Sequence, residues 1–169
     1  MPLTHVHPMI LPDHVFEILA HALAHEPKIA ASRNTSVNLR DLYERHLAVV
    51  LMQAGEPIGF IAAWPVEEGY LEIGSVWVHP DHRRRGLSHT IYEAATTLLS
   101  GNGHIAFQVT TNPLAVRSGQ AVGLQPVQDW TSPVPWHLTC QPCEFVAPEE
   151  QPTCPHRNAT CHLQVMNHV

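Results

Sequence analysis

The sequence predicts an α/β domain with a central mixed sheet, and three observations lead to this expectation. Between about residues 10 and 140, runs with apolar residues at helical spacing alternate with short apolar runs typical of strands. A strand-like run from Tyr70 to Val78 leads through a short loop into a helix-like run that ends at Leu99. The strand-like run from His104 to Thr110 is expected to lie parallel to the first, since a helix connects the two by a right-handed crossover. A chain of 169 residues, 44% of them hydrophobic, fits one such domain.

Four segments are expected to form helices. Asp13 is placed to cap the first helix. The fourth helix has Asn112 as its N-cap, Pro113 at its first position and Gly123 just beyond its end. In the third helix, apolar residues recur at intervals of three and four, which lays an apolar stripe on the sheet. The helices are expected over residues 13–24, 38–46, 87–99 and 113–122.

Six segments are expected to form strands. The turn Ala54-Gly55-Glu56 lies between the first two and predicts a hairpin. The third strand suits the middle of the sheet, because its apolar residues allow burial on both faces. Residues 30–37 show no clear period, and we expect a loop there over a binding cleft. The strands are expected over residues 47–53, 57–64, 70–78, 104–110, 124–130 and 136–140.

Composition limits the classes of function. A formal charge of −6 argues against non-specific nucleic-acid binding, which needs a basic face. No apolar run is long enough to span a membrane, and the first residues lack the charged-then-apolar order of a secretory signal. Most of the 14 histidines are scattered, which is typical of solvated side chains rather than ligands. We expect a soluble, cytoplasmic protein without a nucleic-acid or membrane partner.

A basic loop follows the third expected strand and has the features of an anion site. It contains Arg83, Arg84, Arg85, Gly86, Leu87 and Ser88. Strand, short loop and helix start form the arrangement in which unpaired backbone N–H groups converge on a point of positive potential. Gly86 lets the backbone approach a ligand closely, and the three arginines add charge. The loop is therefore predicted to hold a pyrophosphate.

Two motifs in this order resemble those of the GNAT superfamily of N-acetyltransferases. The spacing Arg-x-x-Gly-x-Ser from Arg83 to Ser88 is similar to the family's Gln/Arg-x-x-Gly-x-Gly/Ala signature, with Ser88 as a small departure. The family's second pattern is Asn-x-x-Ala near the start of the last helix, with Gly-Phe at its end. It is matched here by Asn112, Ala115 and Gly123-Leu124. The order of expected elements over about residues 10 to 140 also resembles this fold, with its first strand weak or missing. The resemblance implies a mostly antiparallel sheet that splays at its two parallel middle strands.

The resemblance implies acetyl-CoA as co-substrate and a set of residues that bind it. The backbone around Trp77 and Val78 would pair with the pantetheine where the parallel strands splay apart. The backbone N–H groups of residues 84–88 would bind the pyrophosphate, and a guanidinium such as that of Arg83 would add a charge-assisted bond. Asn112 belongs to the second motif. An amine would attack the thioester of the acyl-CoA directly.

The resemblance also implies a catalytic glutamate, and it shows that this chain lacks the tyrosine that many family members use as general acid. Glu72 lies fourteen residues before Gly86, where several family members place a general base. The apolar neighbours of Glu72 favour proton uptake by its carboxylate, directly or through water. Glu67 and Glu68, near the start of the strand, are the alternative candidates for the general base. Many family members carry a tyrosine as general acid seven residues after the motif asparagine, and that position here is Gly119. Ser118 and Tyr92 lie nearby in the expected fold without matching it.

The four cysteines all lie in the last thirty residues, so we expect residues 1–140 to form the acyltransferase domain and residues 141–169 a cysteine-rich tail. A structural zinc site on four thiolates would hold a tail that has no core of its own. Two disulfides, redox use of the C-x-x-C pair and unliganded thiols are the alternatives. The cysteines are Cys140, Cys143, Cys154 and Cys161.

Two functions are compatible with these features. The first is transfer of an acetyl group from acetyl-CoA to a primary amine, on a small molecule, a protein lysine or a protein N-terminus. The acidic balance of the chain favours a cationic acceptor such as a polyamine or an aminoglycoside. The second is a catalytically silent module of the same fold that binds CoA, or a protein through the zinc tail. A homodimer is compatible with either.

Overall fold

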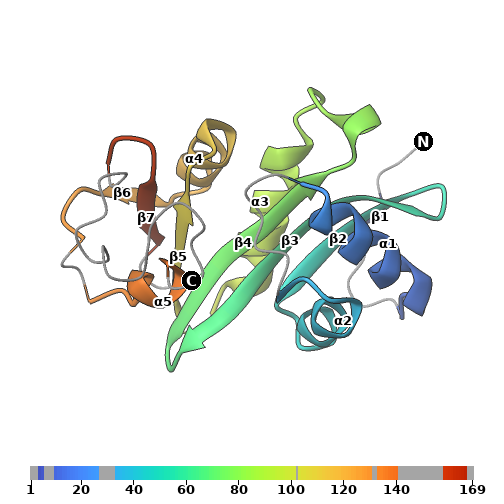
Figure 1. The fold of residues 1–169 in the computed structure, drawn as a ribbon, viewed down its shortest axis with the longest axis horizontal. Helices are drawn as coiled ribbons and strands as arrows, with labels where there is room; N and C mark the ends of the chain where they lie inside the picture. The colour runs from blue at the N-terminus through green and yellow to red at the C-terminus, as the bar shows by residue number, and fades with distance from the viewer. Residues whose placement is uncertain are drawn as a thin grey trace.

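In the computed structural model, one sheet of seven strands organises the described residues, which are 4–5, 10–26, 33–101, 103–130, 133–140 and 158–166. The strand order is β1-β2-β3-β4-β5-β7-β6 (Figure 1). Neighbouring strands are antiparallel except β4 and β5, which are parallel. The strands are β1 (Thr4–His5), β2 (Ala48–Gln53), β3 (Glu56–Glu67), β4 (Tyr70–Val78), β5 (Ile105–Thr110), β6 (Gln125–Val127) and β7 (His162–Met166). This confirms the predicted mixed α/β fold, and β1 agrees with a weak first strand.

Helices cover both faces of the sheet. On one face, α1 and α2 share an apolar cluster with Phe60, Trp64 and Trp77. On the other face, α3 packs against Ile61, Leu71 and other strand residues (Figure 1). None of the helices among the described residues is long and apolar enough to cross a membrane. The helices are α1 (Asp13–Ala24), α2 (Ser36–Glu44), the short 3-10 helix η2 (Pro80–His82), α3 (Leu87–Leu99), α4 (Pro113–Ala121) and α5 (Trp136–Cys140).

Most expected elements are confirmed, with shifts at their ends that have local causes. The helix expected over residues 38–46 begins at Ser36, because the Thr35 hydroxyl accepts a hydrogen bond from the Asn38 amide and caps the helix two residues earlier. The helix α4 has the predicted Asn112 cap, with its Oδ1 accepting from the Leu114 amide at 2.9 Å. The strand expected over residues 124–130 is shortened to β6.

One expected strand is wrong. Residues 136–140 form the helix α5 instead. Pro135 precedes it with a fixed φ suited to a helix start, and the Leu138 amide donates to the Pro135 carbonyl. The Trp136 indole donates to the Trp130 carbonyl at 2.5 Å and is buried. The apolar spacing that suggested a strand therefore belongs to a short helix anchored by its tryptophan.

The strand that completes the sheet comes from the end of the chain. Residues 162–166, which the sequence analysis assigned to the tail, form β7 between β5 and β6. Leu163 and Val165 are buried against Phe107 and Trp136. This part of the expected tail thus contributes directly to the core of the sheet.

Candidate active site

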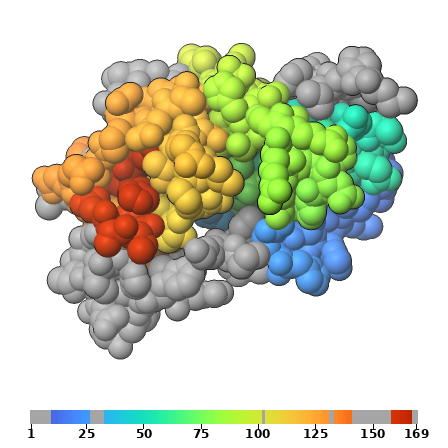
Figure 2. Space-filling model, turned by 90° about the horizontal axis from the view of Figure 1, so that it is seen from above, coloured from blue at the N-terminus to red at the C-terminus, as the bar shows by residue number. Residues whose placement is uncertain are grey.

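The parallel strands β4 and β5 separate after three residue pairs. Their ladder ends at Glu72 opposite Phe107, and β5 continues as the partner of β7 up to Thr110. Seen from above, a hollow separates the green surface of β4 and α3 from the yellow surface of α4 (Figure 2). The expected splay of the two middle strands is therefore present. Its inner corner, the point at which the strands begin to separate, lies at Glu72.

A bulge in β4 reorients the strand just beyond this corner. Gly74 pairs with Ala62 and Trp77 pairs with Phe60, so two residues of β4 lie opposite the single residue Ile61. Ser75 takes a positive φ of 53° there, which is uncommon outside glycine. The extra residue reverses the alternation of faces, so that Trp77 joins the α1 and α2 side of the sheet.

The backbone of Val78 points into the splay. The His79 amide donates to the Ile58 carbonyl at 2.9 Å, which makes Gly59 and Val78 a pair without mutual hydrogen bonds. The N–H and C=O of Val78 consequently point away from β3, whereas those of Trp77 point toward it. The Val78 carbonyl accepts from Arg83 Nε at 2.9 Å.

The basic loop adopts a conformation suited to an anion. Arg84 has a φ of +64° and Gly86, the N-cap of α3, a φ of +77°, so left-handed residues alternate with others along the loop. The unpaired N–H groups at the start of α3, just beyond these residues, form a point of positive potential that suits an anion. A Cβ at Gly86 would meet no atom within 4 Å, so its positive φ, rather than crowding, is what favours glycine there.

The three arginines of the loop are placed differently. Arg83 forms an ion pair with Glu26, two residues after the end of α1, in addition to its bond to Val78. Arg84 and Arg85 are exposed. Arg83 is therefore held along the rim of the splay, and it ties the end of α1 to the loop.

The two sequence motifs meet between α3 and α4. The hydroxyls of Ser88, in the first turn of α3, and Ser118, in α4, lie 3.0 Å apart and are hydrogen-bonded. Leu87 is buried in the core beneath the loop. Asn112 caps α4 with its side-chain oxygen, so its visible role is to fix the start of that helix.

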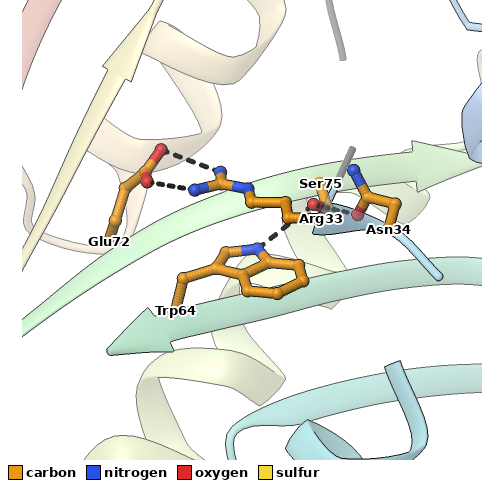
Figure 3. Close-up of polar contacts among 5 residues, drawn as sticks. All are labelled: Arg33, Asn34, Trp64, Glu72 and Ser75. Atoms are coloured by element: carbon orange, nitrogen blue, oxygen red, sulfur yellow. Dashed lines mark hydrogen bonds and ion pairs between the residues drawn. The ribbon is translucent and has the colours of Figure 1, made fainter. Parts of the chain in front are cut away.

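Glu72 is buried and tied to an arginine (Figure 3). Its side chain is 4% exposed, and its two oxygens accept from Arg33 Nη1 at 2.6 Å and Nη2 at 3.1 Å. The Arg33 guanidinium also lies over the Trp64 ring, 4.7 Å from its centroid. The predicted base is thus the carboxylate of a two-pronged ion pair at the corner of the splay.

A second set of bonds fixes the surroundings of this pair. The Trp64 indole donates to the Ser75 hydroxyl at 3.2 Å, and that hydroxyl donates to Asn34 Oδ1 at 2.6 Å. Sequence reasoning missed Arg33 and Asn34, which lie in the stretch without a clear period. The expected loop over a cleft was the available signal, although no motif marks its residues.

The position of the missing tyrosine is filled by a buried amide network. Gln108 on β5 donates to Gln164 on β7 and to the Ala115 carbonyl, the latter at 3.2 Å. A Cβ on Gly119 would lie 2.5 Å from Gln108 Nε2. Tyr92 donates to Gln108 Oε1 at 2.6 Å, and burial raises the pKa of this tyrosine. Gly119 accordingly leaves the room that the two glutamines occupy.

The structure describes two of the four cysteines. Cys140, at the end of α5, and Cys161, just before β7, pack against the same apolar cluster. Cys143 and Cys154 lie outside the described residues. Within the described part of the chain, no group of three or more His, Cys, Asp or Glu side chains is placed to hold a metal ion. The zinc site on the four cysteines stays a prediction.

Comparison with known families decides the class of the protein. The family model described as acetyltransferase (GNAT) family matches residues 14–118. The chain belongs to this family. It is therefore an acyl-CoA-dependent N-acetyltransferase by family. A search of curated protein sequences finds no match.

Solved structures share the GNAT fold at low sequence identity. The PaiA N-acetyltransferase of Thermoplasma acidophilum, in complex with coenzyme A, is 9% identical over 99% of this chain and 100% of its own, with a TM-score of 0.62. A diaminobutyrate acetyltransferase from Paenibacillus lautus, with diaminobutyric acid and coenzyme A, is 13% identical over 98% and 95%, with a TM-score of 0.59. A chimeric spermidine N-acetyltransferase from Vibrio cholerae is 15% identical over 98% and 94%, with a TM-score of 0.56.

Proposed function

We propose that this GNAT protein transfers an acetyl group from acetyl-CoA to a primary amine by direct attack of the amine nitrogen on the thioester. The observation that carries the proposal is the separation of β4 from β5 at Glu72, with the basic loop and the start of α3 beyond the other end of the same strand. A thioester threaded between the strands would reach the one buried carboxylate at the corner. The compared structures with coenzyme A support acyl-CoA as the donor.

The donor half of the site uses backbone groups. The N–H groups of the loop and of the start of α3 would hold the pyrophosphate, with Arg84 and Arg85 adding exposed positive charge. The Val78 N–H, which points into the splay, would hydrogen-bond to the pantetheine. The side chain of Trp77 packs in the core on the α1 and α2 side and would hold this strand in position.

The chemical step needs a proton acceptor. When the amine nitrogen forms its bond to the thioester carbon, it carries a proton that must leave, and Glu72 would receive it directly or through a water molecule. The C–S bond then breaks and CoA departs as a thiolate. Because a thiolate is a stable leaving group, the solvent can supply its proton, which agrees with a glycine at position 119.

The direct test is the replacement of Glu72 by glutamine. E72Q keeps the shape of the side chain and one oxygen acceptor for Arg33, so the fold is expected to persist. We expect kcat to fall by about 100-fold or more, while thermal stabilisation by acetyl-CoA is unchanged. Thiol release measured against a panel of amines, together with melting curves, gives both quantities. An unchanged kcat would remove Glu72 from the chemistry.

A specific observation also favours the second function. Glu72 is already bonded through both oxygens to Arg33, and position 119 has no proton donor. Both features suit a module that binds CoA without transferring its acyl group. Stabilisation by acetyl-CoA with no turnover of any amine would favour this alternative over the enzyme.

A further inference from the structure

The Arg33–Glu72 pair occupies the corner that an acceptor amine must reach, if the proposed acetyl transfer is correct. Glu72 is almost fully buried, whereas the Arg33 side chain is 31% exposed. An incoming molecule therefore meets the guanidinium as well as the carboxylate. The acceptor must suit both charges.

Charge balance separates the possible classes of acceptor. The two side chains neutralise each other, so the corner offers no net negative charge to a polycation. An amine without an anionic group would bring a second cation beside Arg33. An acceptor that carries both an ammonium and a carboxylate can pair with Glu72 and Arg33 at the same time. The overall charge of −6, spread over the whole chain, does not decide this local preference.

The guanidinium is held in a fixed position rather than lying loosely on the surface. Its central carbon lies over the Trp64 ring, and on the strand side Gly74 leaves the space it needs, since a Cβ there would lie 2.9 Å from Arg33 Nη2. The Arg33 backbone carbonyl accepts from Asn38 Nδ2 at 2.9 Å. This is a pre-positioned arginine of the kind that recognises planar carboxylates.

Arg33 also keeps unused donors. Glu72 takes one hydrogen from each terminal nitrogen, which leaves a second hydrogen on each. Its buried Nε has no hydrogen-bond partner among the residues that the structure describes. Arg40 Nε is unpaired in the same way, so it is the terminal hydrogens that leave Arg33 able to donate to a further acceptor such as a carboxylate.

From these observations we infer that the acceptor is a small zwitterion of the amino-acid type. Its carboxylate binds Arg33, and its ammonium binds Glu72. The ammonium first loses one proton to solvent, and the neutral amine then attacks the thioester while Glu72 receives the second proton. The inference favours an acceptor such as diaminobutyrate, the substrate named for one of the compared enzymes, over spermidine, the substrate named for another. It replaces the cationic acceptor that overall composition suggested.

The experiment compares amines that differ only in a carboxylate. The pairs are ornithine with putrescine, lysine with cadaverine, and diaminobutyrate with diaminopropane, and the panel includes spermidine and a lysine peptide blocked at both ends. The readout is kcat/KM from thiol release with acetyl-CoA. We expect the carboxylate member to be preferred by about tenfold or more, as for a hydrogen bond to a charged group.

Two arginine variants connect this preference to the site. R33Q is expected to abolish the preference mainly by raising KM, and R33K to keep part of it. R40Q is the matched control, because Arg40 also pairs with one carboxylate, that of Asp13, and lies over one aromatic ring, that of Phe16, away from the splay. Melting curves with acetyl-CoA show that each variant is folded.

The outcomes are distinct. Turnover of the unsubstituted diamines, spermidine or the blocked peptide as fast as the amino acids overturns the zwitterion and leaves acetyl transfer standing. A preference that survives in R33Q overturns the role of Arg33. Binding of acetyl-CoA without turnover of any amine overturns the proposed function itself.

Discussion

At the scale of single residues, the site depends on side chains that fix one another. Glu72 is bound by Arg33, Arg33 rests on Trp64, and Trp64 donates to Ser75 at the bulge. Because each member positions the next, a change at one is expected to alter the carboxylate through the others. The same logic applies on the far side of the splay, where Gly119 is surrounded by buried amides.

Replacing Gly119 by alanine is a residue-scale test in which two effects have opposite signs. Helix propensity alone would stabilise α4 by about 1 kcal/mol. The new Cβ, however, would lie 2.5 Å from Gln108 Nε2 and 3.0 Å from Gln164 Oε1, and both amides are buried. Displacing them costs about 1–3 kcal/mol per unsatisfied group, so we expect G119A to lower the melting temperature by roughly 2–8 °C.

The matched control for this substitution is Q120A, at an exposed position of the same helix. It is expected to leave the melting temperature nearly unchanged. A rise in the melting temperature of G119A would mean that the Gln108 and Gln164 side chains move aside at little cost in free energy. Position 119 would then be able to accept a larger side chain.

At the scale of elements, the sequence predicted those whose reasons are local. The cap Asn112, the helical stripe of α3 and the strand Tyr70–Val78 were found where expected. The strand β7 was not, because its burial depends on partners far along the chain, such as Phe107. The helix at Trp136 was not, because five residues are too few for apolar spacing to distinguish a helix from a strand. For the site, Glu72 and the loop carried a recognisable spacing, whereas the role of Arg33 arises only from tertiary contact.

The loop and α1 are linked by the Glu26–Arg83 ion pair, and this linkage can be tested through CoA affinity. A bound pyrophosphate would compete with Glu26 for the guanidinium. We therefore expect R83A to weaken CoA binding by about 3- to 10-fold, and E26Q, which frees the arginine, to tighten it by a smaller factor. Isothermal titration of CoA measures both. Weakening by E26Q as large as that by R83A would show that the pair only positions the loop.

The cysteine-containing segment makes a separate element-scale prediction. If the four sulfurs fasten the chain between α5 and β7, protein purified without chelator is expected to contain about one equivalent of zinc. Removing the metal would then loosen β7 and lower the melting temperature. Elemental analysis and thiol titration decide this. Less than about half an equivalent, with four titratable thiols, would contradict the zinc site.

At the scale of the whole molecule, the splay divides the sheet into two halves, which are joined by an apolar cluster that packs α3 against Ala106 and Leu124. One half holds β1 to β4 with α1 to α3, and the other holds β5 to β7 with α4 (Figure 1). Below the splay they share three residue pairs between β4 and β5. Among the described residues, two hydrogen bonds between side chains also connect α3 to the second half, Ser88 with Ser118 and Tyr92 with Gln108. The stability of the whole fold is therefore expected to be sensitive to Tyr92.

This sensitivity predicts a particular response to alkaline pH. Burial raises the pKa of Tyr92 above its ordinary value of 10.0, so the folded protein keeps the proton that the unfolded chain releases. The contribution of Tyr92 to stability is complete below about pH 10 and is lost as the pH rises further, by up to about 1.4 kcal/mol per pH unit. Y92F leaves Gln108 Oε1 without this donor and is expected to cost about 1–2 kcal/mol at neutral pH, but it has no proton to lose. Urea unfolding of the two proteins between about pH 8 and pH 11 measures their free energies of unfolding. These free energies should converge as the pH rises. If they instead change in parallel with pH, Tyr92 does not hold the two halves together in its neutral form.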